Sequence, residues 1–406
     1  MPGIDREWRD GGRVLFAAAV GVGVGIPALI NCASLFIVPM QQEFGWSRSA
    51  VAIGPIVGLI YSILNPIGGM VIDRVGARRA AIAGLIVLSA LLLALAAVPV
   101  QKAVFYSLLI LFGVIGTVTN NVVFCKAVAT WFRRNAGASV ALVLTGVSVM
   151  GALTQPVLAQ VIANYGWRMG YVMLAAMALL IGLPVVLIWF REQTENARLN
   201  TAQPGNVEGA SLAEAMRDKR FWLIVAAFGS AAVPIGGFVS QMQPLLLGKG
   251  FASAAAASLV SVFLVATGIG RIAAGILFDH FRPPVVAALF LGVSALGALL
   301  LGTTDATTSW LAIAFALTLI GLAQGAEGDF IALFVLRIFG VQHFSALFAT
   351  MAMVAGITFA AGGFLFAAVF DRNGNYTVAV LAAAAVLLLA ALIALTVRVP
   401  PAAAAS

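Results

Sequence analysis

Three charged side chains stand inside long apolar stretches in the second half of the sequence: Arg271, Glu327 and Asp329. A guanidinium group stays charged and can grip a carboxylate through two parallel hydrogen bonds. Gly268 and Gly275 lie on the same helical face as Arg271 and leave space around it. We therefore predict that Arg271 binds a carboxylate ligand. The alternative is a structural ion pair with Glu327 or Asp329, and the two arrangements can also alternate within one cycle.

The two acidic residues are candidates for carrying a proton. Residues two positions apart on a helix point about 200° apart, so Glu327 and Asp329 cannot both face one cavity directly. Loss of water favours the protonated form of a carboxyl group, whereas a neighbouring arginine favours the carboxylate. We predict that Glu327 or Asp329, under both influences, takes up and releases a proton. The alternatives are a structural bridge for either acid, and a pair between Asp329 and Arg337, two turns further along.

Uncharged polar residues also occur within the apolar stretches. Each can contact a ligand or form a hydrogen bond between helices. Asn120 and Asn121 are adjacent, so at most one points straight at a cavity, and Asn121 is preferred because it aligns with Glu327 in an internal repeat. The predicted ligand contacts besides Arg271 are Asn31, Tyr61, Asn121, Gln155 and Gln241, with Gln324 as a further candidate.

These residues need elements that hold them inside an apolar medium. Of the 406 residues, 62% are hydrophobic and only 9% are charged, whereas a soluble domain carries about 25% charged residues. A soluble globular protein is therefore excluded. An apolar helix of about 20 residues spans a bilayer, and breaks in hydrophobicity predict an all-α membrane protein with twelve transmembrane helices. Their approximate ranges are 14–38, 49–70, 80–99, 103–126, 136–163, 169–190, 221–247, 252–278, 284–303, 307–336, 343–369 and 376–397.

The 23 Lys and Arg residues are distributed unevenly between the two sides of the predicted membrane. Most of them fall on the side that holds the N-terminus, and such a bias marks the cytoplasmic side. We predict a multi-pass protein of the cell (inner) membrane with both termini in the cytoplasm. The net charge of +8 follows from this topology, so we expect no nucleic-acid partner.

The longest polar segment divides the chain into two halves. We predict an N-terminal six-helix bundle at 1–190, a cytoplasmic linker at 191–220 and a C-terminal six-helix bundle at 221–406. Within the linker, Ser211 and Glu214 form a capping-box pattern, which predicts a short amphipathic helix at 211–219.

The run GMVIDRVGARR follows the second predicted span, and a constant shift aligns Gly69–Asp73 with Gly275–Asp279. It resembles the signature loop G-x-x-x-D-R-x-G-x-R-R of the major facilitator superfamily. Glycines let helices approach closely, an aspartate can accept hydrogen bonds from a helix N-terminus, and basic residues hold the loop at the membrane surface. The alternative is that the basic residues only anchor the topology. The predicted gating residues are Gly69, Asp73, Arg74, Gly76, Arg78 and Asp279.

Shorter motifs follow in order along nearly the whole chain, at Gly45-Trp46, Trp131–Gly137, Gly166-Trp167, Gly268–Gly275 and Gly325–Asp329. Together they resemble the monocarboxylate porter and oxalate/formate exchanger branch of that superfamily. In that branch the matching arginine binds the substrate carboxylate. Dianion exchangers of the branch carry a lysine in span eleven, and animal monocarboxylate carriers carry one in span one. This chain has neither, so the identity of the anion stays open.

The resemblance implies two bundles that work by alternating access around a central site. We predict a secondary active transporter of a small organic anion, a monocarboxylate, with proton symport, functional as a monomer. The alternatives are an exporter of drugs or aromatic compounds, an anion exchanger, and a transporter-like sensor. The two cysteines and two histidines build no metal or nucleophile cluster, so we expect no enzyme activity, no cofactor and no metal.

Overall fold

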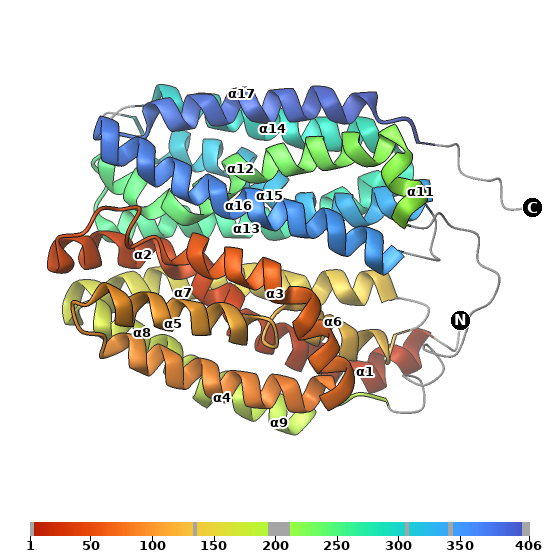
Figure 1. Cartoon of the computed structure of the whole chain (residues 1–406), viewed down its shortest axis with the longest axis horizontal. Helices are drawn as coiled ribbons and strands as arrows, with labels where there is room; N and C mark the ends of the chain where they lie inside the picture. The colour runs from red at the N-terminus through yellow and green to blue at the C-terminus, as the bar shows by residue number, and fades with distance from the viewer. Residues whose placement is uncertain (1–3, 133–135, 194–211, 305–307, 340–343, 400–406) are drawn as a thin grey trace, which may run out of the picture. The chain divides into compact units, whose positions relative to one another are not determined.

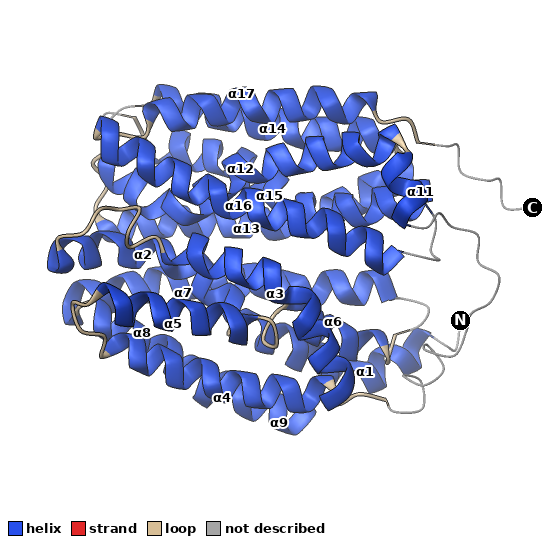
Figure 2. Ribbon diagram, in the orientation of Figure 1, coloured by secondary structure: helices blue, strands red, loops and turns tan. Residues whose placement is uncertain are grey.

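The computed structural model describes residues 4–132, 136–193, 212–304, 308–339 and 344–399. Those residues form helices joined by loops and turns, with no β-strand among them (Figure 1, Figure 2). The first half contains α1 Ile4–Gly23, α2 Ile26–Phe44, α3 Ile53–Val75, α4 Ala77–Ala96, α5 Lys102–Gly116, α6 Asn121–Ala129, α7 Ala136–Tyr165, α8 Trp167–Met177 and α9 Leu183–Trp189. The second half contains α11 Leu212–Arg217, α12 Lys219–Gly248, α13 Ser253–His280, α14 Pro283–Thr303, α15 Trp310–Phe339, α16 Phe344–Asn373 and α17 Thr377–Thr396.

The helices match the predicted membrane spans in number and order. Within the described residues, 11 helical stretches are long and apolar enough to cross a membrane, and α3 adds a shorter apolar stretch, Ile53–Asn65. In a bilayer the backbone polar groups must be satisfied within the segment, which a helix does. The prediction of an all-α membrane protein with twelve spans is confirmed.

Three spans of the first half are not continuous α-helices. Span one stops at Gly23 and resumes at Ile26, span four stops at Gly116 and resumes at Asn121, and span six contains a π-helical turn, Ala178–Gly182. The first two breaks lie against each other, because a Cβ atom at Gly25 would collide with the carbonyl oxygen of Thr119. Pro near the start of α2 and the Asn120 cap of α6 each suit a helix beginning there.

The described contacts divide the chain into two compact units. The first unit is Met1–Gln203 with Ala252–Ser261, and the second is Pro204–Phe251 with Val262–Ser406. Most of the predicted linker, 194–211, lies outside the described residues, and so does Ser211 of the capping box. Where the predicted short helix continues into the described residues, α11 is present and is followed directly by α12.

Helices of the second unit pack through glycine contacts and an aromatic core. On α12, a Cβ atom at Gly236 would collide with the carbonyl oxygen of Phe359 on α16, so no larger residue fits there. Small residues of this kind let transmembrane helices approach closely. The α12, α13, α14 and α15 helices share a cluster of five phenylalanines with ring centroids 5.6–5.9 Å apart: Phe228, Phe278, Phe290, Phe330 and Phe334.

Candidate functional site

Arg271 on α13 forms an ion pair with Asp329 on α15. Its Nε donates a hydrogen bond to Asp329 Oδ2 at 3.1 Å and a second one to the carbonyl oxygen of Gly325 at 3.2 Å. The Arg271 and Asp329 side chains are 16% and 29% exposed. Of the two acids that the sequence offered as partners, the structure brings Asp329 to the guanidinium.

Glycines on both helices set the distance between α13 and α15. A Cβ atom at Gly270 would collide with the carbonyl oxygen of Leu322, and one at Gly325 would collide with that of Thr267. The backbones therefore touch in the turn of α13 that leads to Arg271, and the Arg271 Nε reaches the Gly325 carbonyl oxygen. Gly275, which was predicted from the sequence to leave space around Arg271, has open space, since a Cβ atom there would meet nothing within 4 Å.

The terminal nitrogens of Arg271 remain available for a ligand. Among the described residues, every hydrogen bond of this side chain runs through Nε, and neither terminal nitrogen appears among the fully enclosed atoms that lack a partner. The hydrogen bonds from Nε therefore fix the orientation of the guanidinium, and its two terminal nitrogens remain partly exposed. A carboxylate that approached them would meet a fixed pair of parallel donors.

Glu327 lies in different surroundings from Asp329, although both belong to α15. Its residue exposure is 8%, and its Oε1 is enclosed with no hydrogen-bond partner among the described residues. Because the two residues point about 200° apart around the helix axis, only Asp329 reaches α13. Gln324, one turn before Glu327, likewise has an enclosed Oε1 without a partner in the described part of the chain.

The suggested pair between Asp329 and Arg337 is wrong. Eight residues of helix rise about 12 Å, which is too far for the two side chains to meet. Arg337 instead donates from Nη2 to the carbonyl oxygen of Phe278 at 3.3 Å, and its guanidinium carbon lies 5.3 Å from the centre of the Phe278 ring.

In the first unit the preferred asparagine differs from the one that organises the polar contacts. Asn120 accepts hydrogen bonds from the backbone N–H groups of Val122 and Val123, which caps α6, and donates from Nδ2 to Asn65 Oδ1 at 2.8 Å. The Tyr61 side chain lies close to Asn120. The Oδ1 of Asn121 is enclosed with no hydrogen-bond partner among the described residues. Asn65, which the sequence analysis did not select, belongs to this network.

The two predicted glutamines form hydrogen bonds between helices. Gln155 on α7 donates from Nε2 to the backbone carbonyl oxygen of Asn31 on α2 at 2.7 Å. Gln241 on α12 accepts a hydrogen bond of 2.9 Å from the Tyr376 hydroxyl. Both glutamines are fully buried, and each keeps one enclosed amide atom, Gln155 Oε1 and Gln241 Nε2, without a partner in the described residues.

Glu192, which was not predicted from the sequence, contacts the signature loop. Gly76 has a φ of +91°, which favours glycine, and separates α3 from α4. Both carboxylate oxygens of Glu192 lie 3.0 Å from the backbone nitrogen of Ala77, at the N-terminus of α4, and Arg78 donates to the carbonyl oxygen of Leu187 at 2.7 Å. An acid at a helix N-terminus is favourable, so this contact joins the loop to the end of span six.

The other predicted loop residues contribute less to the described contacts. A Cβ atom at Gly69 would meet nothing within 4 Å, and Arg74 is exposed. The side chains of Asp73 and Asp279 lie outside what the structure describes.

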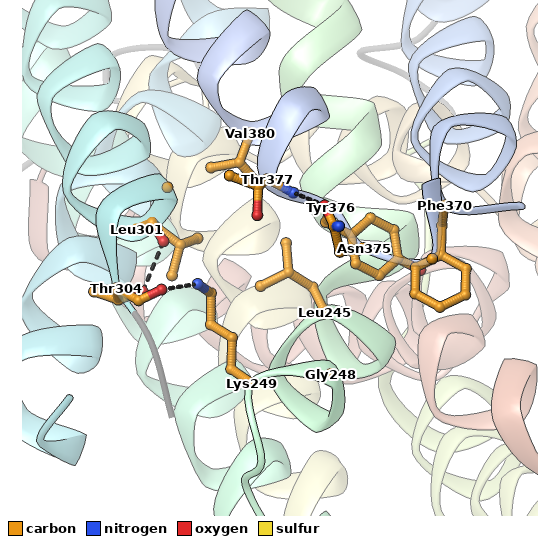
Figure 3. A pocket seen from close by; sticks show the side chains of 12 residues that line it. Leu245, Gly248, Lys249, Leu301, Thr304, Phe370, Asn375, Tyr376, Thr377 and Val380 are labelled. Atoms are coloured by element: carbon orange, nitrogen blue, oxygen red, sulfur yellow. Dashed lines mark hydrogen bonds between the residues drawn. The ribbon is translucent and has the colours of Figure 1, made fainter. Parts of the chain in front are cut away.

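A separate cavity of about 180 Å³ lies in the second unit, at the ends of α12, α14 and α16 and the start of α17 (Figure 3). None of the ligand-binding residues predicted from the sequence lines it. Its lining combines apolar side chains with one lysine, Lys249, whose Nζ donates to the carbonyl oxygen of Thr304 at 2.8 Å.

Comparisons with known proteins agree with the helical architecture. A family model described as Major Facilitator Superfamily matches residues 15–336. A Thermoproteus tenax protein described as an uncharacterized 38 kDa protein in a 23S RNA operon is 28% identical over 375 residues, which are 86% of this chain and 91% of that protein. Monocarboxylate transporter 11 of Mus musculus is 26% identical over 302 residues, which are 72% of this chain and 65% of that protein.

Two solved transporters share the fold. The nucleoside transporter NupG superposes with a TM-score of 0.74 at 13% identity, covering 95% of this chain and 99% of that one. A peptide transporter, POT, superposes with a TM-score of 0.70 at 14% identity, covering 96% and 97%. The family and these structural neighbours are transporters, which points away from catalysis. The chain therefore belongs to the Major Facilitator Superfamily and is a multi-pass membrane transporter.

Proposed function

We propose that the chain is a secondary active transporter of a small organic anion, a monocarboxylate, which crosses together with a proton by alternating access. The observation that carries this proposal is the state of Arg271. Its Nε is held by Asp329, and its terminal nitrogens make no hydrogen bond within the described residues. The printed name of the mouse relative, a monocarboxylate transporter, supports the same substrate class.

The charge balance of this site favours a proton as the coupled ion. Arg271 and Asp329 together carry no net charge, so a monocarboxylate bound to the arginine would leave one negative charge inside the membrane. An uncompensated charge there is costly. One proton for each anion removes that cost, because the loaded site is then as neutral as the empty one.

Asp329 is the acid best suited to receive the proton. The substrate carboxylate and Asp329 compete for the same guanidinium, so protonation of Asp329 releases Arg271 to the substrate, and loss of the proton restores the ion pair. Glu327 is the alternative. It forms no ion pair in the described part of the chain that would stabilise a carboxylate form, so it is better suited to stay protonated throughout the cycle.

The orientation and the working unit follow from the same groups. We place both termini in the cytoplasm, because most Lys and Arg residues lie on that side. A single chain suffices, since Arg271 and Asp329 belong to one unit.

Transport into proteoliposomes tests the substrate class. With the outside more acidic than the inside, we expect accumulation of at least one of radiolabelled lactate, acetate and benzoate. Arg271→Ala should abolish it, because the guanidinium is the carboxylate's counter-charge. Arg168→Gln is the matched control, since Arg168 also forms an ion pair, with Glu43, but at the ends of α2 and α8. Undiminished accumulation by Arg271→Ala would remove this arginine from the role.

Substitution of the two acids tests the coupling. Asp329→Asn cannot release a proton, so it should exchange internal for external anion while losing accumulation driven by the pH gradient. Glu327→Gln should retain both. If Glu327→Gln alone loses gradient-driven accumulation, the proton belongs to Glu327 and the assignment to Asp329 is wrong.

A further inference from the structure

The surface of α13 next to Arg271 is open on the side of Gly275. Gly275 is exposed, and a Cβ atom at this position would meet nothing within 4 Å. It follows Arg271 by one helical turn, which places the two residues about 40° apart around the helix axis. Side chains of a helix extend back toward its N-terminus, so a larger residue at position 275 would extend toward Arg271. The glycine therefore keeps free the space beside the guanidinium.

Two exposed isoleucines border this open space. Ile272 and Ile276 are 44% and 58% exposed. They lie about 100° and about 140° around the helix axis from Arg271, with Gly275 between them and the arginine. The face of α13 that packs on α15 is on the other side of Arg271, where Gly270 touches the α15 backbone. Around the helix, the packed face is thus followed by a charge, then by a gap without a side chain, and then by an apolar surface.

The charge of Arg271 indicates that this open side is not turned to lipid. A charged side chain within a span faces the bundle interior or a water-filled space. The terminal nitrogens of Arg271, which form no hydrogen bond within the described residues, need such surroundings. Because Gly275 lies next to Arg271 around the helix axis, the space beside it belongs to the same surroundings. A molecule that bound the guanidinium from this side would place the rest of its body over Gly275 and against the isoleucines.

We propose that Gly275, Ile272 and Ile276 receive the body of the substrate whose carboxylate binds Arg271. The substrate is then a monocarboxylate with an apolar body, an alkyl or aryl acid and not a hydroxy or amino acid, because these three residues offer it no polar side chain. The missing side chain at position 275 limits the size of that body. This inference rests on the carboxylate-binding role proposed for Arg271.

Chemical modification of Arg271 measures the open space without any substrate. Phenylglyoxal condenses with the terminal nitrogens of a guanidinium, and peptide mass spectrometry follows the modified Arg271 in the purified, full-length protein. We expect Gly275→Leu to slow this modification severalfold, because the added side chain covers the guanidinium, and Gly275→Ala to slow it less. Gly292→Leu is the matched control, because a Cβ atom at Gly292, on α14, would also meet nothing within 4 Å.

Protection of Arg271 by unlabelled acids then measures which body the site accepts. We expect hexanoate to protect at lower concentration than butyrate, and butyrate than acetate, by up to about fourfold for each CH₂ group that is buried. The hydroxylated analogue 3-hydroxybutyrate should protect less well than butyrate, since its hydroxyl group finds no partner. Ile272→Ser should reduce the dependence on chain length. Ile269→Ser should not, because Ile269 is also exposed but its side chain extends away from Arg271, toward the N-terminus of α13.

The Gly275 variants should lose protection by hexanoate before they lose protection by acetate. If Gly275→Leu does not fold, Gly275→Ala decides, since it adds a single methyl group to open space. Unchanged modification of Arg271 in the Gly275 variants, or equal protection by acids of every size, would overturn this inference and leave the role of Arg271 intact. If no acid protects Arg271 in the unsubstituted protein, the carboxylate-binding role itself is wrong and this inference is overturned with it.

Discussion

The two units place polar groups inside the membrane in different ways. In the first unit, spans one and four are interrupted, and uncharged side chains, Asn120 and Asn65, form a hydrogen bond between helices. In the second unit, α12 and α15 run for 30 residues without a break, and the polar interior includes the Arg271–Asp329 ion pair. The ion pair that Arg168 forms in the first unit lies at helix ends, where its side chains are 44% and 39% exposed.

This difference has a physical consequence for substrate recognition. Backbone groups freed by a helix break need partners inside a bilayer, and uncharged amides supply them without adding charge. A charged pair, by contrast, is costly to enclose and has value mainly where charge must be recognised. For the anion transport proposed above, this comparison leads us to propose that the second unit recognises the charge and that the first unit contributes hydrogen bonding and shape.

The largest loss of stability in the second unit is expected from a substitution at the close contact of α13 and α15. At Gly325 an added Cβ atom would collide with the Thr267 carbonyl oxygen and lie 2.9 Å from the backbone nitrogen of Arg271. Because backbone atoms cannot rotate away, we expect Gly325→Ala to separate the helices at a cost of about 3 kcal/mol, the upper part of the usual range for overpacking. Gly328→Ala is the control on the same helix, since a Cβ atom there would meet nothing within 4 Å.

Thermal denaturation in detergent checks this pair of variants. Gly325→Ala should lower the unfolding temperature and the yield of folded protein, whereas Gly328→Ala should leave them unchanged or raised, because alanine is the better helix former. Equal behaviour of the two variants would show that the glycine contact does not set the helix spacing.

The contrast also shows which features of the fold and the site could be predicted from the sequence and which could not. The twelve spans could be predicted because apolar length alone identifies them. The partner of Arg271 was left open between Glu327 and Asp329, although a signal was present: Gly321, Gly325 and Asp329 recur every four residues and so share one helical face. A Cβ atom at Gly321 would meet the carbonyl oxygen of Phe263, so this face is the one that packs on α13.

Other features of the site had no readable signal in a single sequence. The break in span one contains Gly25 and precedes a proline, but glycine and proline are common in continuous transmembrane helices as well. The role of Glu192 depends on a contact between segments that are 115 positions apart. The same applies to the hydrogen bond between Asn65 and Asn120, because helical periodicity gives the face of a residue and not the neighbouring helix.

Substitution of Asn120 tests the uncharged network of the first unit. Asn120→Ala removes the acceptor for the Val122 and Val123 N–H groups and the donor to Asn65. We expect a loss of about 2 kcal/mol, as is usual when buried backbone donors are left without a partner. Asn121→Ala is the matched control: the Asn121 Oδ1 has no hydrogen bond among the described residues, so its removal should be neutral or stabilising. A larger loss for Asn121→Ala, measured by thermal denaturation, would contradict this assignment of the cap.

The second unit also has a helix cap, and we expect the smallest stability effect from it because it lies at the surface. Asp218 caps α12 through a hydrogen bond of 2.8 Å from the backbone N–H of Arg220, whose guanidinium also bonds to the carboxylate at 2.6 and 2.9 Å. These hydrogen bonds from the Arg220 side chain hold the pKa of Asp218 below its usual value. The stabilisation is therefore present above the unfolded-state pKa and is lost as the pH falls through the lower, folded-state pKa. Both side chains are partly exposed, so we expect this ion pair to contribute less than about 1 kcal/mol to the free energy of unfolding.

Asp218→Asn keeps an oxygen for the cap and removes only the charge. Its thermal stability should fall slightly below that of the unsubstituted protein at neutral pH and match it in acid. A loss as large as that of Asn120→Ala would mean that burial is not what separates the two caps.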